Sequence, residues 1–132
     1  MSRPDWRELL AIFGGGAVGA LLRVWLEHTY AAGPATWPWT TFIINVSGSF
    51  ALGYLATRLQ ERLPRSTYRR PLLGTGFCGA YTTFSTMQLE ILKMLDHDRY
   101  GLAAGYAIAS LACGYLAVWV ASASVRRVRV LA

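Results

Sequence analysis

Four apolar stretches separated by short polar segments run through the chain, at residues 9–26, 39–59, 71–95 and 101–124. Each is close to the ~20 apolar residues that a helix needs to cross a hydrocarbon core of ~30 Å. Because backbone polar groups in lipid must be satisfied within their own segment, such stretches form helices. The sequence is 54% hydrophobic and only 15% charged, which is too apolar for an ordinary soluble domain. It therefore predicts an all-α membrane protein, with one transmembrane domain of four helices over residues 1–132.

Ten of the twelve arginines lie on one side of the predicted membrane. The opposite side holds only Lys93 and Arg99, which lie beside Asp96 and Asp98. By the positive-inside rule, the arginine-rich side faces the cytoplasm, so we predict a multi-pass plasma-membrane protein with both termini inside. No basic face interleaved with aromatic residues suggests nucleic-acid binding. The arginines that fix this orientation are Arg3, Arg7, Arg58, Arg62, Arg65, Arg69, Arg70, Arg126, Arg127 and Arg129.

The sequence does not favour an enzyme. His28 and His97 lie at the edges of loops without the spacing of metal ligands, and no nucleophile is paired with a base. Cys78 and Cys113 lie within apolar stretches, where a thiol behaves as a small hydrophobic group. Small residues four apart are typical of close helix packing in membranes, and they occur as Gly15 and Gly19, Ser49 and Gly53, and Ser110 and Gly114.

Polar residues inside the stretches are more informative, because each needs a partner or water. Thr41, Asn45 and Ser49 share one face of the second predicted helix. The Asn45 amide can donate two hydrogen bonds to an anion without carrying a charge, or it can bond to a neighbouring helix, and the sequence leaves both open. Arg23 lies near the end of the first stretch, where it can extend to the interface or pair with another helix, and we favour the interface.

The third stretch predicts a broken helix. Gly74, Gly76 and Gly79 precede a run of threonine and serine from Thr82, and both groups are poor helix formers. Carbonyls freed at such a break are ligands for a small monovalent cation. Phe84 and Met87 follow three residues apart, and an aromatic ring edge carries partial positive charge that can meet an anion, although packing is the more common role.

At this point the sequence resembles the CrcB/Fluc family of fluoride channels. The resemblance is carried by the G-x-x-T-T-F-S-T motif from Gly79 to Thr86 and by Asn45 after W-P-W-T-T, and it covers nearly the whole chain. It implies an antiparallel, dual-topology dimer with two pores along the subunit interface. It also implies passive fluoride export that reduces fluoride toxicity, and a structural sodium ion at the dimer centre.

The resemblance also implies roles for single residues. Gly79 and Thr82 would offer backbone carbonyls to sodium, Asn45 would donate to fluoride, and Phe84 would be the first of two pore phenylalanines. Two positions depart from the family pattern: Met87 stands at the second phenylalanine, and Gly114 stands where a hydroxyl would extend the polar track. The remaining pore candidates are Thr41, Thr86, Tyr106 and Ser110.

An antiparallel homodimer requires half of the chains to be inverted, yet the arginines favour one orientation. We therefore expect the second subunit to be a homologue with the opposite bias, with a homodimer as the alternative. Two other functions stay open on the residues alone. A small multidrug antiporter needs a membrane carboxylate, for which Glu90 is the candidate, and a non-transporting assembly protein would use the glycines for packing. The prediction that the ion is fluoride rests on the resemblance alone.

Overall fold

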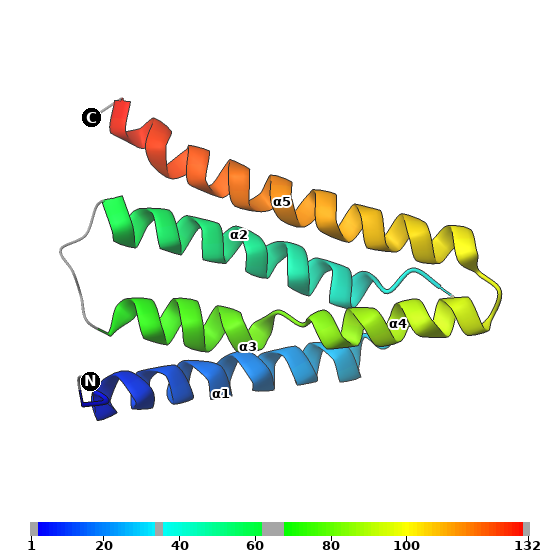
Figure 1. The fold of residues 1–132 in the computed structure, drawn as a ribbon, viewed down its shortest axis with the longest axis horizontal. Coiled ribbons are helices and arrows are strands. Elements are labelled where there is room, and N and C mark those ends of the chain that lie inside the picture. Colours follow the sequence, from blue (N-terminus) through cyan, green and yellow to red (C-terminus); the bar gives the residue numbers. More distant parts are fainter. Residues whose placement is uncertain (1–2, 34–35, 62–67, 131–132) are drawn as a thin grey trace.

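The computed structural model describes residues 3–33, 36–61 and 68–130. The helical rods run antiparallel in Figure 1, and the described residues contain no strand. The third rod along the chain, residues 70–96, is interrupted. The predicted all-α fold with a broken third helix is therefore confirmed. The elements are α1 (Trp6–Thr29), α2 (Trp39–Glu61), η1 (Arg70–Cys78), α3 (Gly79–Tyr81), α4 (Phe84–Asp96) and α5 (Tyr100–Val130).

Both ends of the described chain lie at the same end of the bundle (Figure 1). The C-terminal end of α2 and the start of η1 lie there too, whereas the turn after α4 lies at the opposite end. The arginines of the two tails and of the flanks of the α2–η1 connection are thus at one end of the molecule. Arg62 and Arg65 lie outside the described residues, as does the side chain of Arg129.

Helix α1 packs against η1 and α3 through glycine. Its start is capped by Asp5, whose carboxylate accepts a hydrogen bond from the Arg7 N–H at 2.9 Å. A Cβ at Gly15 or Gly19 would overlap the backbone of η1, and a Cβ at Gly76 would lie 2.6 Å from the Ile12 carbonyl oxygen. This close backbone contact, which only glycine allows, fixes the position of the third rod against α1.

The third rod is divided by two extended residues. Segment η1 is a π-helix that begins at Arg70 and Pro71 and continues into the single turn of α3. Thr82 and Thr83 then adopt extended backbone, with ψ of 150° and 116°, before α4 begins at Phe84. Thr83 caps α4 by accepting a hydrogen bond from the Thr86 N–H at 3.2 Å. The break therefore has a local cause, the capping threonine, whereas the preceding glycines lie in helical backbone within η1 and α3.

Large apolar side chains cover the outer surface of the bundle, as expected in lipid. Within the described residues, two helices are long and apolar enough to cross a membrane by length and composition, Trp6–Thr29 and Tyr100–Val128. Helix α2 carries Asn45 and several hydroxyl residues, and the break divides the third rod into pieces shorter than a span. At ~1.5 Å per residue, the 31 residues of α5 measure about 46 Å, so this helix exceeds a hydrocarbon core of ~30 Å.

Candidate functional site

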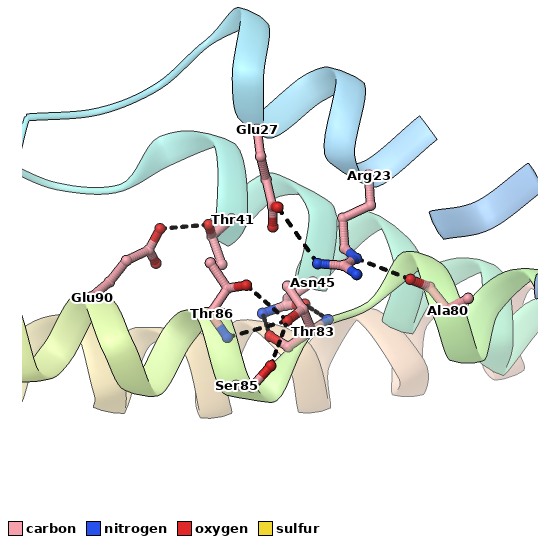
Figure 2. A network of polar contacts seen from close by, with 9 residues as sticks. All are labelled: Arg23, Glu27, Thr41, Asn45, Ala80, Thr83, Ser85, Thr86 and Glu90. Carbon is pink, nitrogen blue, oxygen red and sulfur yellow. Dashed lines mark hydrogen bonds and ion pairs between the residues drawn. The ribbon is translucent and has the colours of Figure 1, made fainter. Parts of the chain in front are cut away.

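The break in the third rod is held by Asn45 from α2 (Figure 2). The Asn45 Nδ2 donates to the Thr83 carbonyl at 2.9 Å, and the Thr83 N–H donates to Asn45 Oδ1 at 2.8 Å. One amide thus satisfies both backbone groups of an extended residue. Asn45 makes the interhelical bond that the sequence left open, and one Nδ2 hydrogen remains for a further acceptor.

This clamp changes the bonding of the preceding carbonyls. In a continuous helix the Thr83 N–H would bond to the Gly79 carbonyl, four residues earlier. Because that N–H donates to Asn45 instead, the Gly79 carbonyl loses its helical donor. Thr82 has extended backbone, and Gly79 is exposed at the surface of the subunit. Backbone oxygens of this kind suit a hard cation, and among the described residues no cluster of His, Cys, Asp or Glu offers another metal site.

Arg23 lies at the same break, which corrects the expected interfacial position. Its Nε donates to the Ala80 carbonyl at 3.1 Å, and its Nη1 lies 3.5 Å from Glu27 Oε2 (Figure 2). The Ala80 carbonyl at the end of α3 is a partly buried acceptor without its helical donor, so it attracts a long donor more strongly than the interface does. Arg23 therefore takes the alternative of pairing with another helix.

A groove of about 430 Å³ begins at the break and runs between α2, α4 and α5. Its polar lining residues come from α2, from the break and from α5. Exposed apolar side chains form its walls, among them Phe84, Leu111 and Tyr115. The polar lining residues are Asn45, Ser49, Thr82, Thr83 and Ser110.

Phe84 and Met87 both line this groove but differ in exposure. Phe84 is 66% exposed, whereas Met87 is 7% exposed and packs in the core with Met94, Ala103 and Tyr106. Within one chain, Phe84 is thus free to present its ring to a neighbour, and Met87 mainly fills the space between α4 and α5.

Glu90 has a position that sequence analysis missed. Its carboxylate accepts hydrogen bonds at 2.7 Å from both the Thr41 hydroxyl and the Tyr106 hydroxyl. Thr41 and Tyr106 are almost completely buried, so these two pore candidates face the interior of the subunit and not the groove. The sequence did offer one indication that Glu90 lies near the pore candidates. It follows Met87 by three residues and Thr86 by four, so the three side chains share one face of a helix.

The other predicted residues lie close to the break. The Thr86 hydroxyl accepts a hydrogen bond from the Thr83 hydroxyl at 3.0 Å. The Ser110 hydroxyl oxygen is buried and has no hydrogen-bond partner among the described residues, and Gly114 lies one turn further along the groove. The structure therefore brings Asn45, Thr82, Phe84, Met87, Ser110 and Gly114 to one groove, with Gly79 and Thr86 beside the break.

Comparison with known proteins places these features in a family. Residues 10–122 match the model of the family described as "CrcB-like protein, Camphor Resistance (CrcB)". The chain is similar to "Fluoride-specific ion channel FluC 1" of Mycolicibacterium paratuberculosis, with 60% identity over 98% of each chain. It is 56% identical to the protein of the same name from Mycobacterium bovis, again over 98% of each chain. It is 38% identical to "Fluoride-specific ion channel FluC" of Rhizobium meliloti, over 90% of this chain and 96% of that one.

Proposed function

The chain belongs to the CrcB family, and we infer from this membership that it is a subunit of a fluoride-specific ion channel. Relatives with 56–60% identity over nearly their full length carry that name. Passive fluoride flow through such a channel would return accumulated fluoride to the outside and reduce its toxicity. In this interpretation α1, α2, the rod from η1 to α4, and α5 are the four membrane spans.

The groove is the observation that supports a channel most directly. Its buried Ser110 hydroxyl has no hydrogen-bond partner in the part of the chain that the structure describes, and its polar lining opens onto the surface of the subunit. Polar groups that face lipid are costly, so this groove requires a protein or aqueous neighbour. A second, antiparallel subunit that covers the groove would turn it into a narrow polar passage with apolar walls. We therefore place the pore along the subunit interface.

The groove offers donors that can replace the water around fluoride. Fluoride is small and strongly hydrated, so a selective path must offer several hydrogen-bond donors at short range. We propose that the free Nδ2 hydrogen of Asn45 and the Ser110 hydroxyl supply such donors, with the exposed ring of Phe84 presenting its positive edge. Thr41 and Tyr106 do not line this path and instead hydrogen-bond to Glu90, and Thr86 hydrogen-bonds to Thr83. A narrow passage of this kind would exclude chloride by size.

We propose that a sodium ion binds at the dimer centre through backbone carbonyls. The residues fit this role, because the clamp on Thr83 leaves the Gly79 carbonyl without its helical donor and Thr82 is extended. Gly79 and Thr82 of each subunit would hold the ion. A bound cation would neutralise the carbonyl dipoles that the two breaks bring together.

The partner subunit follows from the asymmetry of charge. The ends of α1, α2, η1 and α5 that carry or adjoin most of the arginines lie on one side of the bundle, which favours a single orientation with both termini in the cytoplasm. We propose a heterodimer with a homologous subunit of opposite bias, which would also supply the aromatic side chain absent at Met87. A functional antiparallel dimer purified from this chain alone would contradict the heterodimer and leave the channel intact.

The pore assignment is tested with two exposed phenylalanines. Phe84 lines the groove and is 66% exposed, whereas Phe13 on α1 is 76% exposed and lies outside the groove. Neither change to alanine should affect folding much, since neither ring is buried in the chain. We expect Phe84→Ala to lower fluoride efflux from liposomes by about tenfold or more, equivalent to ~1.4 kcal/mol of barrier, and Phe13→Ala to leave it unchanged. Equal efflux from both variants would overturn the placement of the pore in this groove.

A further inference from the structure

The break leaves a second carbonyl without its helical donor, that of Ala80. In a continuous helix it would accept from the N–H of residue 84, but Thr82 and Thr83 are extended and α4 starts anew at Phe84. Arg23 replaces this donor from α1, with Nε 3.1 Å from the Ala80 oxygen (Figure 2). Of the two neighbouring carbonyls, Gly79 thus lacks its helical donor, whereas Ala80 accepts from Arg23.

Two features make this contact firm. The Arg23 guanidinium is only partly exposed and is oriented by Glu27, one turn later on the same helix, at 3.5 Å. The backbones of α1 and the third rod are also in close contact just before it, because a Cβ at Gly19 would overlap the Phe77 backbone. Arg23 thus reaches Ala80 from a helix whose distance to α3 is fixed by glycine packing.

We propose that Arg23 is a positioning residue for the cation site. By holding the Ala80 carbonyl toward α1, it leaves the Gly79 and Thr82 carbonyls as the oxygens that face the dimer centre. The Arg23–Glu27 pair carries no net charge, so Arg23 acts through a directed hydrogen bond and not as a positive charge that attracts fluoride. This inference rests on the proposed channel function and adds a role for α1 to it.

The hydrogen bond can be observed without any ion flux. Ala80–Tyr81 is the single Ala–Tyr pair in the sequence, so protein labelled with 1-¹³C-alanine and ¹⁵N-tyrosine gives one carbon–nitrogen signal, from the Ala80 carbonyl. In solid-state NMR of the protein in liposomes, we expect Arg23→Met to move this carbonyl signal upfield, because the donor is lost. Glu27→Gln should leave it nearly in place. An unmoved signal in folded Arg23→Met protein would overturn the proposal.

In the fluoride efflux assay, a matched set of variants separates the effect of the Arg23 charge from the effect of its hydrogen bond to Ala80. We expect Arg23→Met to raise the sodium concentration for half-maximal efflux by about tenfold, which corresponds to ~1.4 kcal/mol. The double variant Arg23→Met/Glu27→Gln restores the charge balance but not the bond to Ala80, so it should behave like the single variant. Recovery of wild-type sodium dependence in the double variant would show that only charge matters and would overturn the proposal.

Two controls keep the result interpretable. If Arg23→Met does not fold, Arg23→Lys takes its place, since it keeps the charge but lacks the Nε–H and the planar fork, and its Ala80 signal should still move upfield. Wild-type protein without fluoride efflux would contradict the channel, and the Ala80 signal would still report on the Arg23 contact. Failure of the channel and failure of the positioning role are therefore distinguishable.

Discussion

Replacing Asn45 with alanine should both destabilise the protein and close the break. The change removes the hydrogen bonds of 2.9 Å and 2.8 Å that join the amide to the Thr83 backbone. At about 0.5–1.5 kcal/mol each, two such bonds correspond to a loss of about 1–3 kcal/mol in the free energy of unfolding. The released Thr83 N–H then becomes available to the Gly79 carbonyl, as in a continuous helix, so we also expect half-maximal fluoride efflux to require a higher sodium concentration.

The measurement is unfolding of the purified protein in mixed micelles, followed by helical circular dichroism during a denaturing detergent titration. Ser49→Ala is the matched control, because Ser49 lies one turn further on the same helix and lines the same groove. We expect Ser49→Ala to cost less than about 0.5 kcal/mol. If Asn45→Ala costs no more than Ser49→Ala, the amide does not hold the break and the reasoning is refuted.

Three further predictions test the packing around the site. Gly15→Ala should cost about 1–3 kcal/mol, since its Cβ would overlap the Leu72 carbonyl, whereas Gly14→Ala has open space and should be neutral or stabilising; equal stabilities would refute the close α1–η1 contact. Thr41→Val and Tyr106→Phe should each cost about 1.5–3 kcal/mol by removing one bond to Glu90, and a double-mutant cycle should show coupling; additive losses would argue against a shared carboxylate. Met87→Phe should destabilise by about 1–3 kcal/mol, because Met87 fills the core; a larger ring accepted without loss would show that position 87 opens to the pore.

The fold could be predicted from the sequence because lipid leaves few alternatives. Apolar stretches of spanning length must form helices, and the glycines before Thr82 marked the break that the structure confirms. The ends of the helices were less accessible to this reasoning, since α1 and α5 continue beyond their apolar stretches to Thr29 and Val130. Hydrophobicity locates the part of a helix inside lipid and says little about the turns outside it.

Most residues of the site could be predicted from the sequence, but their hydrogen-bond partners could not. Asn45, Phe84 and Ser110 do come to one groove, but the pairing of Asn45 with Thr83 depends on how α2 meets the break, which spacing does not reveal. The interfacial position favoured for Arg23 was wrong, and the partners of Glu90 were not predicted, for the same reason. Each residue lies toward one end of its apolar stretch, yet each has a hydrogen-bond partner on a neighbouring helix. A polar residue near the end of a span can reach water or bond to a neighbouring helix, and only the packed structure shows which of the two occurs.

Selective fluoride efflux tests the central claim most directly. The protein is reconstituted into liposomes loaded with fluoride or with chloride, alone and with a homologous subunit of opposite arginine bias, and efflux is followed with ion-selective electrodes. The account predicts that fluoride leaves rapidly in at least one of these preparations while chloride is retained. If the folded protein passes no fluoride in either preparation, or passes chloride equally fast, the assignment as a fluoride-specific channel is contradicted.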